Sequence, residues 1–339
     1  RRMQLSIIVP VYNMAAEKKL EYCLDSLVAQ TVADYEIIAV DDCSADESWE
    51  ILKSYEARFP DKFRALHLEE NRHQGGAKNA GLRIAQGEWI GFIDSDDWIT
   101  PDMYERLIGR AISTGADLVG CDYCLTSEHS MKVGQVVHNN KSSQTGVLDD
   151  GKRRSLILDG GSLVVKIFRR AMIVEHELWF PEHIFYEDNV LANHFEYIEE
   201  PLYYYYQHES STVHTISEKR CEDRCEAGRL MLEEAKRHDF LDRYGVELEY
   251  SFTLLFYVNT LFTYMAGVKR TKYQFVKKLG EEMRCRFPHF QENPYYLERT
   301  HAEEKKLIRM HMKSTLWFMA YYKLLWAYRN FRKRHGSRR

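Results

Sequence analysis

The chain has 339 residues, of which 45% are hydrophobic and 13% aromatic, with 18 glycines and 7 prolines. This composition excludes disorder, collagen and coiled coil as descriptions of the whole chain, and the length favours about two domains. The formal charge of −4 conceals an asymmetry: residues 323–339 hold seven basic residues and no acidic one, so the first 322 residues carry 40 basic and 51 acidic residues, a sum of −11. An acidic body with one basic end argues against nucleic acid as a partner.

The first 125 residues alternate apolar runs of period two with segments of helical periodicity. Strands are expected at residues 5–9, 35–40, 63–68, 89–93 and 117–123, and helices at 20–28, 49–58 and 77–86, with a further helix whose first turn contains Pro101. Asp46 is the expected N-cap of the second helix, and Gly87 follows the third. Single helices between strands predict a doubly wound, mostly parallel α/β sheet, which binds ligands at the carboxyl ends of its strands.

The rest of the chain changes character twice. Residues 126–150 are rich in Ser, Asn, Gly and His, which indicates a loop or an exposed hairpin, and residues 156–206 are mixed and strongly aromatic. Beyond about residue 217 the pattern is helical, and residues 252–264 predict a buried core helix, with a membrane span as the alternative that Asn259 and the short length disfavour. We expect a first domain over residues 1–215 and a helical region over 216–339.

The seven cysteines are scattered through segments of regular pattern, which suits reduced thiols. Cys121 and Cys124 form a single CxxC pair, and Cys221 and Cys225 share one face of an expected helix. No second pair stands at metal-ligand spacing, so a zinc site is the less favoured alternative. No apolar stretch is long enough to span a membrane, and we expect the chain to be cytoplasmic.

Four polar clusters directly follow expected strands. They are Pro10 to Asn13, Asp41 to Ser44, Asn71 to Gly76, and Asp94 to Asp97. Because parallel strands end at the same edge of a sheet, these clusters are expected to converge on one crevice. The carboxylates of the last cluster suit Mg²⁺ or Mn²⁺, and such an ion could clamp a diphosphate; an acidic turn that caps the next helix is the alternative.

The second and third clusters have the chemistry of a nucleotide site. Asp41 and Asp42 can accept hydrogen bonds from a base or from ribose hydroxyls. The glycine pair that ends in Gly76 precedes an expected helix whose N-terminus would face phosphate, with Arg72 and Lys78 supplying positive charge. A glycine-rich helix start alone is common, so the argument depends on the clusters together.

Four ordered segments, Ser6 to Asn13, Val40 to Asp46, Lys78 to Leu82 and Gly87 to Asp97, together closely resemble the family 2 inverting glycosyltransferases of GT-A fold. A weaker resemblance at 165–168, 185–188 and 200–205 is typical of bacterial capsule, exopolysaccharide and teichoic acid transferases. The resemblance implies that a nucleoside-diphosphate sugar, most often a UDP-sugar, donates its sugar to a hydroxyl of a glycan or lipid-linked acceptor.

The resemblance also implies roles for individual residues. Pro10, Tyr12 and Asp42, or alternatively Asp41, would hold the uridine, and Asp94 would contact ribose or sugar. Asp96, with Asp94, would ligate Mn²⁺ or Mg²⁺. The remaining expected contacts with the nucleotide sugar are Asn13, Asn71, Gly76, Lys78, Asn79, Ser95 and Asp97.

The acidic pair Glu187 and Asp188 matches the position from which the family draws its general base, and Asp188 is the expected base. An acid pair at a helix N-terminus is the alternative. The sequence departs from the family at Lys78 and Tyr206, where Arg is frequent. His208 or His214 could supply a third metal ligand or a phosphate contact.

Two other functions are alternatives. A nucleotidyltransferase would normally have a glycine-rich phosphate loop after the first strand, where this chain has Pro10 to Asn13. A non-catalytic scaffold or glycan-binding subunit would have no physical reason to keep the mutually repelling carboxylates. Residues 316–331 resemble an interfacial amphipathic helix, so residues 315–339 are expected to dock on the inner membrane surface; a core-packed helix with a solvated basic tail is the alternative.

Overall fold

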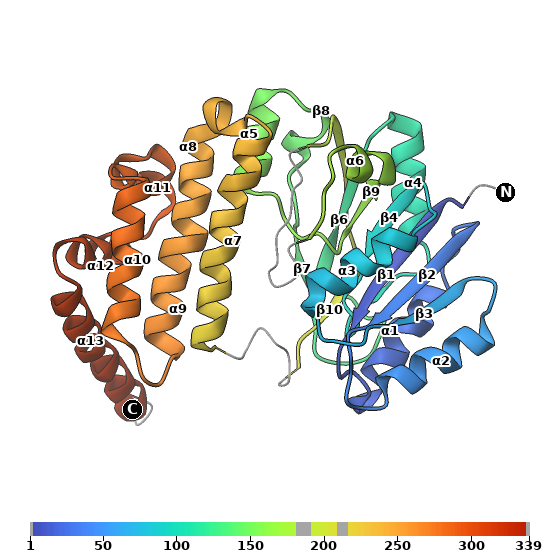
Figure 1. The fold of residues 1–339 in the computed structure, drawn as a ribbon, viewed down its shortest axis with the longest axis horizontal. Coiled ribbons are helices and arrows are strands. Elements are labelled where there is room, and N and C mark those ends of the chain that lie inside the picture. Colours follow the sequence, from blue (N-terminus) through green and yellow to red (C-terminus); the bar gives the residue numbers. More distant parts are fainter. Residues whose placement is uncertain (1–2, 181–190, 209–215, 337–339) are drawn as a thin grey trace. The chain divides into compact units, whose positions relative to one another are not determined.

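The computed structural model describes residues 3–180, 191–208 and 216–336, and the chain forms two compact units, Arg1–Ser211 and Thr212–Arg339 (Figure 1). The strands of the first unit are β1 (Leu5–Val11), β2 (Tyr35–Asp41), β3 (Phe63–His67), β4 (Trp89–Phe92), β5 (Trp98–Ile99), β6 (Leu118–Thr126), β7 (Gln135–Val137), β8 (Gly146–Val147), β9 (Lys166–Arg169) and β10 (His194–Tyr206). Its α-helices are α1 (Lys19–Val28), α2 (Ser48–Arg58), α3 (His73–Ile84), α4 (Met103–Thr114), α5 (Asp150–Leu158) and α6 (Arg170–Glu175).

The strands form one mixed, mostly parallel sheet in the order β3-β2-β1-β4-β9-β6-β10-β5. Strands β3, β2, β1 and β4 are mutually parallel, as the sequence predicts, and Ile7 of β1 lies opposite Ile37 of β2 and Gly91 of β4. The expected fifth parallel strand, β6, does not follow β4 directly, because β9 lies antiparallel between them. Strand β9 has only four residues, too few for a clear period-two signal.

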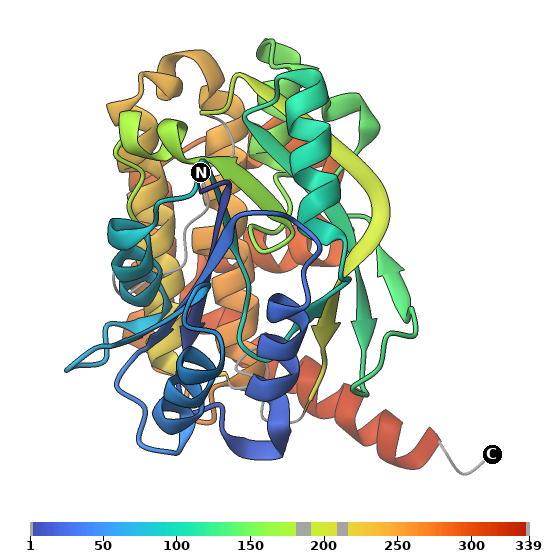
Figure 2. The same cartoon turned by 90° about the vertical axis from the view of Figure 1, so that its right-hand side faces the viewer.

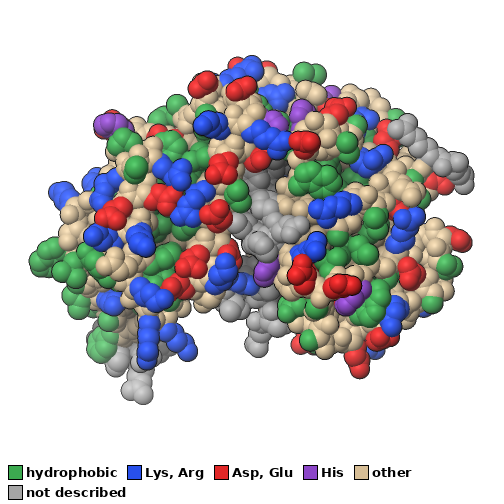
Figure 3. Space-filling model, viewed as in Figure 1, with side chains coloured by type: hydrophobic (Ala, Val, Ile, Leu, Met, Phe, Trp, Pro, Cys, Tyr) green, Lys and Arg blue, Asp and Glu red, His purple; other side chains and the backbone are tan. Residues whose placement is uncertain are grey.

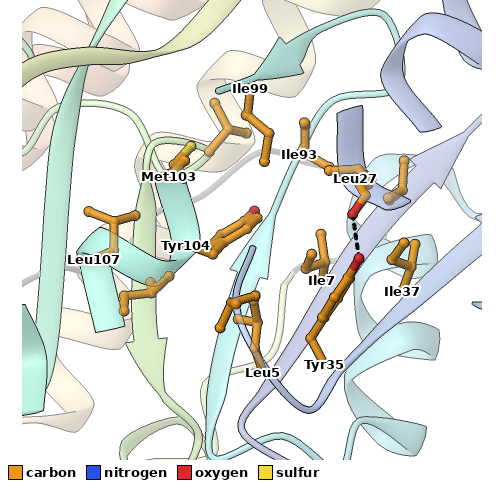
Figure 4. Close-up of a cluster of buried hydrophobic side chains, with 14 of the residues drawn as sticks. Leu5, Ile7, Leu27, Tyr35, Ile37, Ile93, Ile99, Met103, Tyr104 and Leu107 are labelled. Atoms are coloured by element: carbon orange, nitrogen blue, oxygen red, sulfur yellow. Dashed lines mark hydrogen bonds between the residues drawn. The ribbon is translucent and has the colours of Figure 1, made fainter. Parts of the chain in front are cut away.

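Helices cover both faces of the sheet (Figures 1 and 2), and alternate residues of β1 enter two separate cores. Ile7 belongs to the core formed with α1, α2 and α4, whereas Ile8 belongs to the core formed with α3, α5 and α6. Figure 4 shows the first core, where Tyr104 of α4 lies among the aliphatic side chains and the Tyr35 hydroxyl donates to the Leu27 carbonyl at 3.0 Å. Because both faces are buried, the central strands are largely apolar, and the polar pair within them, Ser6 and Glu36, is joined by a hydrogen bond of 2.7 Å from the Ser6 hydroxyl.

Three helix starts differ from the sequence predictions. Helix α2 begins at Ser48 with Glu47 at the cap position, and Asp46 instead accepts from the N–H groups of Ser48 and Ala15 at 3.0 and 2.9 Å. Helix α3 begins at His73, four residues before the expected start, and α4 begins after Pro101, at Met103. Residues 126–150 contain β7, which folds back as a hairpin on β6, and the short strand β8, so the hairpin alternative was correct.

The described part of the second unit is helical. Its α-helices are α7 (Glu218–Arg237), α8 (Phe240–Phe252), α9 (Asn259–Gly267), α10 (Tyr273–Arg286), α11 (Pro294–Arg299), α12 (Ala302–Lys313) and α13 (Thr315–Gly336). A π-helical segment, Thr253–Val258, joins α8 to α9, and Phe256 and Tyr264 are completely buried, which confirms the predicted core helix. In the residues that the structure describes, no helix is long and apolar enough to cross a membrane.

Candidate active site

The loops after β1 and β2 are joined directly by hydrogen bonds. Asn13, which has a positive φ of 51°, donates its N–H to Ser44 Oγ at 2.9 Å, and its side-chain oxygen accepts from the N–H of Ala45 at 2.8 Å. Tyr12 is 49% exposed beside this junction, whereas Pro10 is buried within β1. The structure therefore brings the first two polar clusters together, with Tyr12 available to contact a ligand and Asn13 engaged in holding the loops.

Asp42 joins the second cluster to the third. Its Oδ1 accepts from the N–H of Arg72 at 2.7 Å, and its carbonyl accepts from Asn71 Nδ2 at 3.2 Å. Burial raises the pKa of the Asp42 carboxyl above its ordinary value, although the Arg72 N–H and nearby His73 oppose this shift. Gly76 lies on the first turn of α3, where a Cβ atom would stand 2.3 Å from Arg72 Cβ, so only glycine fits there without a shift.

Asp41, the neighbour of Asp42, lies in the interior. Its Oδ2 is 2.7 Å from Nδ1 of His67 on β3, and it also accepts from the N–H of Ser44 at 3.4 Å. Its Oδ1 is buried and has no hydrogen-bond partner. Asp41 is completely buried, against 3% exposure for Asp42, so its carboxyl is the less accessible of the two to a nucleotide.

The acidic cluster after β4 is connected to α3 and to the end of β10. Gln74 Nε2 donates to Asp94 Oδ1 at 2.5 Å, and His208 Nε2 lies 2.9 Å from Asp96 Oδ2. Asp96 and His208 are 112 positions apart in the chain, and their side chains are 18% and 6% exposed. Gln74 was not singled out from the sequence, although it lies within the third cluster.

Asp97 is held within the protein by β10. Its Oδ2 accepts from the hydroxyl of Tyr203 at 2.5 Å, and its Oδ1 accepts from the N–H of Tyr206 at 2.8 Å. Burial, and then repulsion by Asp96 and Asp94, raise the pKa of the Asp97 carboxyl well above its usual range. Asp97 is 1% exposed and Ser95 is 5% exposed, so both lie buried beneath the surface of the acidic turn.

Asp96 and His208 fit a divalent cation by geometry and chemistry. A carboxylate oxygen and an imidazole nitrogen 2.9 Å apart can share one ion at the usual bond lengths of about 2.0–2.2 Å. Among the described residues, no group of three or more His, Cys, Asp or Glu side chains could hold a metal. Mg²⁺ typically uses one or two carboxylates and completes its shell with substrate phosphates and water, so a site of few protein ligands suits a diphosphate complex.

Lys78 and Asn79, in the middle of α3, contact the segment at Phe180. The Lys78 ammonium lies 5.2 Å from the ring centroid of Phe180 and 5.7 Å from that of Phe92. Asn79 Nδ2 donates to the Phe180 carbonyl at 2.6 Å, and its Oδ1 accepts from the Phe180 N–H at 2.8 Å. Both side chains are nearly completely buried, at 5% and 2% exposure. Their contacts within the described structure are therefore with protein.

Three predicted site residues lie outside the described residues. They are Glu187, Asp188 and His214. The described site contains further groups that the sequence did not indicate, namely Gln74 and Tyr203. No single-sequence signal identifies Tyr203 among four consecutive tyrosines, because their alternation on β10 says only which face each one takes.

Comparisons with known proteins agree with this architecture. The family model described as "Glycosyl transferase family 2" matches residues 6–156. The chain is 32% identical over 308 residues to EpsH of Bacillus subtilis (strain 168), whose name assigns it provisionally to the glycosyltransferases, and the match covers 85% of each chain. It is 32% identical over 184 residues to the poly(ribitol-phosphate) beta-glucosyltransferase of Bacillus spizizenii, covering 54% of this chain and 27% of that protein.

Solved structures share the fold at low sequence identity. Residues 1–349 of S. aureus TarS, crystallised with UDP-GlcNAc, match with a TM-score of 0.53 and 20% identity over 94% of this chain and 82% of that chain. The mannosyltransferase PcManGT of Pyrobaculum calidifontis, in complex with GDP-Man and Mn²⁺, matches with a TM-score of 0.50 and 15% identity over 96% of this chain and 88% of that chain. With this fold and the coverage of EpsH, the chain belongs to glycosyltransferase family 2 and is a glycosyltransferase of GT-A fold.

Proposed function

We propose that the protein transfers a sugar from a UDP-sugar to a hydroxyl of a glycan or lipid-linked acceptor in cell-surface polysaccharide synthesis, with inversion at the anomeric carbon and with Mn²⁺ or Mg²⁺ as cofactor. The observation that carries the proposal is the contact of His208 with Asp96, one residue from Ser95 and two from Asp94, at the sheet edge where Asp42 also lies. TarS binds UDP-GlcNAc and PcManGT binds GDP-Man with Mn²⁺, which supports a nucleotide-sugar donor and a divalent ion for this chain.

The described residues divide the work of donor binding. Tyr12, half exposed after β1, is placed to pack on the base. Asp42 is 3% exposed, with Oδ1 held by the Arg72 N–H, and its second carboxylate oxygen is the proposed acceptor for a base N–H. Asp94, oriented by Gln74, would contact ribose or the sugar. Asp96 and His208 would hold the metal, which when bound supplies positive charge to the diphosphate as it leaves. A diphosphate with that neutralisation needs no proton to depart.

The acceptor needs a base to remove its proton, because a sugar hydroxyl is a weak acid. Asp188, with Glu187 beside it, is proposed as the general base that takes the hydroxyl proton while the oxygen attacks the anomeric carbon. The Asn79 and Lys78 contacts with Phe180 anchor the chain a few residues before this pair. We therefore assign Asn79 and Lys78 a positioning role in the proposed reaction, in place of the direct donor contact expected from the sequence.

We further propose that residues 315–339 dock on the anionic inner surface of the cell membrane. One face of α13 is packed, with Phe318, Met319 and Tyr322 at most 7% exposed. The opposite face is apolar and exposed, with Leu316, Trp317 and Leu324 at 68–73%. Figure 3 shows hydrophobic side chains at the left-hand edge, where α13 runs in Figure 1. The segment contains no acidic residue and seven basic ones from Lys323 onward, which complements anionic lipid.

The catalytic assignment is tested by measuring UDP release in the presence of acceptor. Asp188→Asn should abolish most of the release while the variant still binds UDP, because only proton removal from the acceptor is lost. Full retention of the rate would refute Asp188 as the base. A thermal-shift panel of UDP-, GDP- and dTDP-sugars, each with and without Mn²⁺, identifies the donor nucleotide. Stabilisation by GDP- or dTDP-sugars alone would refute the uridine assignment.

A further inference from the structure

Aromatic rings from three separate segments surround the end of β10. Tyr22 comes from α1, Trp98 is in β5, His129 lies between β6 and β7, and Tyr206 ends β10. The His129 ring stacks on the Tyr22 ring, with centroids 4.7 Å apart and planes 10° apart. The centroid of the His129 ring also lies 4.7 Å from that of the Tyr206 ring. Trp98 meets His129 edge to face at 5.3 Å. His129 contacts each of the other three rings, and so does Trp98, which lies 4.7 Å from Tyr22 and 5.6 Å from Tyr206.

The segment that carries His129 is fixed to the same strands by hydrogen bonds. Trp98 Nε1 donates to the Ser130 carbonyl at 3.0 Å, and the Tyr204 hydroxyl donates to the Met131 carbonyl at 2.9 Å. These bonds hold the backbone beside His129 against β5 and β10. The ring thus has a defined position from which it can support Tyr206.

Tyr206 connects this aromatic cluster to the acidic turn in two ways. Its N–H donates to Asp97 Oδ1, and its ring lies 5.0 Å from the ring of His208. His208 in turn meets Asp96 at 2.9 Å. A displacement of Tyr206 would therefore move both the backbone that leads to His208 and the imidazole that faces Asp96.

The nitrogen chemistry of His129 shows which property of the side chain matters. Its Nε2 is buried and has no hydrogen-bond partner. Burial also lowers the pKa of His129. The side chain is half-buried and meets Tyr22, Trp98 and Tyr206 through its ring, so it acts through packing.

We propose that His129 is a positioning residue of the metal centre: its ring, packed between Tyr22 and Tyr206, holds the end of β10 so that His208 reaches Asp96. The inference rests on the proposed function, because it takes Asp96 and His208 as the protein ligands of the cation. It adds a contribution from the β6–β7 segment, which carries none of the expected ligands. Residues that orient metal ligands commonly affect affinity without touching the ion.

The test measures Mn²⁺ affinity at saturating UDP, by electron paramagnetic resonance of free Mn²⁺, for the full chain and three variants. His129→Ala and His129→Leu remove the flat ring, and we expect Mn²⁺ to bind about tenfold more weakly, the lower range seen for residues that orient metal ligands. His129→Phe keeps a flat aromatic ring and removes the two ring nitrogens, of which Nε2 has no hydrogen-bond partner, so it should bind Mn²⁺ nearly as wild type does. Unchanged affinity in both His129→Ala and His129→Leu would overturn the proposal, as would an equal loss in His129→Phe.

Phe275→Ala is the matched control for loss of stacking. Phe275 is half-buried and stacks on Tyr264 in the helical unit, with centroids 4.2 Å apart. This variant should lose thermal stability but keep its Mn²⁺ affinity, which separates a general packing defect from an effect on the metal centre. If wild-type protein with UDP binds no Mn²⁺, the proposed metal dependence itself fails. If wild type binds and His129→Leu binds equally well, only the role of His129 fails.

Discussion

Asn79 forms a pair of hydrogen bonds with the backbone of Phe180, donating to its carbonyl at 2.6 Å and accepting from its N–H at 2.8 Å, across 101 positions of sequence. Asn79 lies on α3, the helix whose first turn also presents Gln74 to Asp94. One helix therefore contacts both the acidic turn after β4 and the segment that leads toward Asp188. This relationship is the basis for the positioning role that we propose for Asn79.

Asn79→Ala should lower kcat more than it changes UDP affinity, because Phe180 loses its anchor while the donor contacts remain. Leaving the two half-buried backbone groups of Phe180 without these partners should also cost about 1–3 kcal/mol of unfolding free energy. Steady-state kinetics, UDP titration and urea unfolding measure the three quantities. Asn293→Ala is the control: Asn293 is also buried and accepts from the N–H of Tyr295 at 3.0 Å, far from α3 in the chain. It should lose stability without the kcat effect, and equal kcat losses would contradict the assignment.

Asp42→Asn and Asp41→Asn should distinguish a carboxylate that binds UDP from one that stabilises the fold. Asp42→Asn removes the charge from the acceptor proposed for the base, and we expect about tenfold weaker UDP binding, as for a hydrogen bond to a charged group. Asp41 is completely buried and directed at His67, so Asp41→Asn should change thermal stability and leave UDP affinity within about twofold. Isothermal titration with UDP decides, and a larger affinity loss in Asp41→Asn would reverse the assignment.

The helical unit should lose stability in mild acid because of His311. This side chain is 1% exposed, and burial lowers its pKa to about 4. The unfolded histidine has a pKa near 6.5, so between these values the unfolded chain binds more protons than the folded one, and stability falls as pH falls. Between pH 7 and pH 4, His311 should lower the free energy of unfolding by on the order of 3 kcal/mol.

His311→Gln removes this titration and keeps an acceptor for the Tyr257 hydroxyl, which lies 2.7 Å from His311 Nδ1. Denaturant unfolding of both proteins at pH 7.5 and pH 5 gives the comparison. Wild type should lose more stability on acidification than the variant does. Parallel losses in the two proteins would mean that His311 does not titrate as its burial requires.

Membrane docking predicts that the exposed face of α13 carries the interaction. Trp317→Ser combined with Leu324→Ser should weaken sedimentation with anionic liposomes at least about tenfold, because each large side chain contributes about 1.5–3 kcal/mol when buried. Ile112→Ser is the control, since Ile112 is similarly exposed, at 66%, on α4. Deletion of residues 315–339 should abolish sedimentation. Unchanged binding after deletion, or self-association through this face in place of lipid binding, would contradict the proposal.

The sequence was most informative where strands end. Because β1, β2 and β4 are largely apolar, the apolar pattern assigns the residues after them to one edge of the sheet, and Asn13, Asp42 and Asp94 follow these strands. The insertion of β9 could not be foreseen, since its pairing with β4 and β6 depends on contacts between distant segments. Residue type also did not reveal that Asp97 and Asn79 bond to protein atoms, because burial decides this and single-sequence patterns do not report it.

The contact of His208 with Asp96 likewise could not be predicted from the sequence, because it joins two distant segments. The sequence offered His208 and His214 as alternatives, and only the path of β10 brings His208 to the acidic turn. Pro201 interrupts the register between β10 and β6, so the positions that follow it cannot be counted forward from Phe195 by simple alternation. Such long-range register is set by tertiary packing.

The most direct test of the proposed donor site is isothermal titration of UDP into wild type and Asp96→Asn, each with Mn²⁺ and with EDTA. The account predicts that Mn²⁺ strengthens UDP binding to wild type at least about tenfold, or about 1.4 kcal/mol, because the cation links the diphosphate to Asp96 and His208. Asp96→Asn should lose most of this enhancement and remain folded, since its side chain is partly exposed at the surface. Equal UDP affinity for wild type in Mn²⁺ and in EDTA would contradict the metal-dependent site.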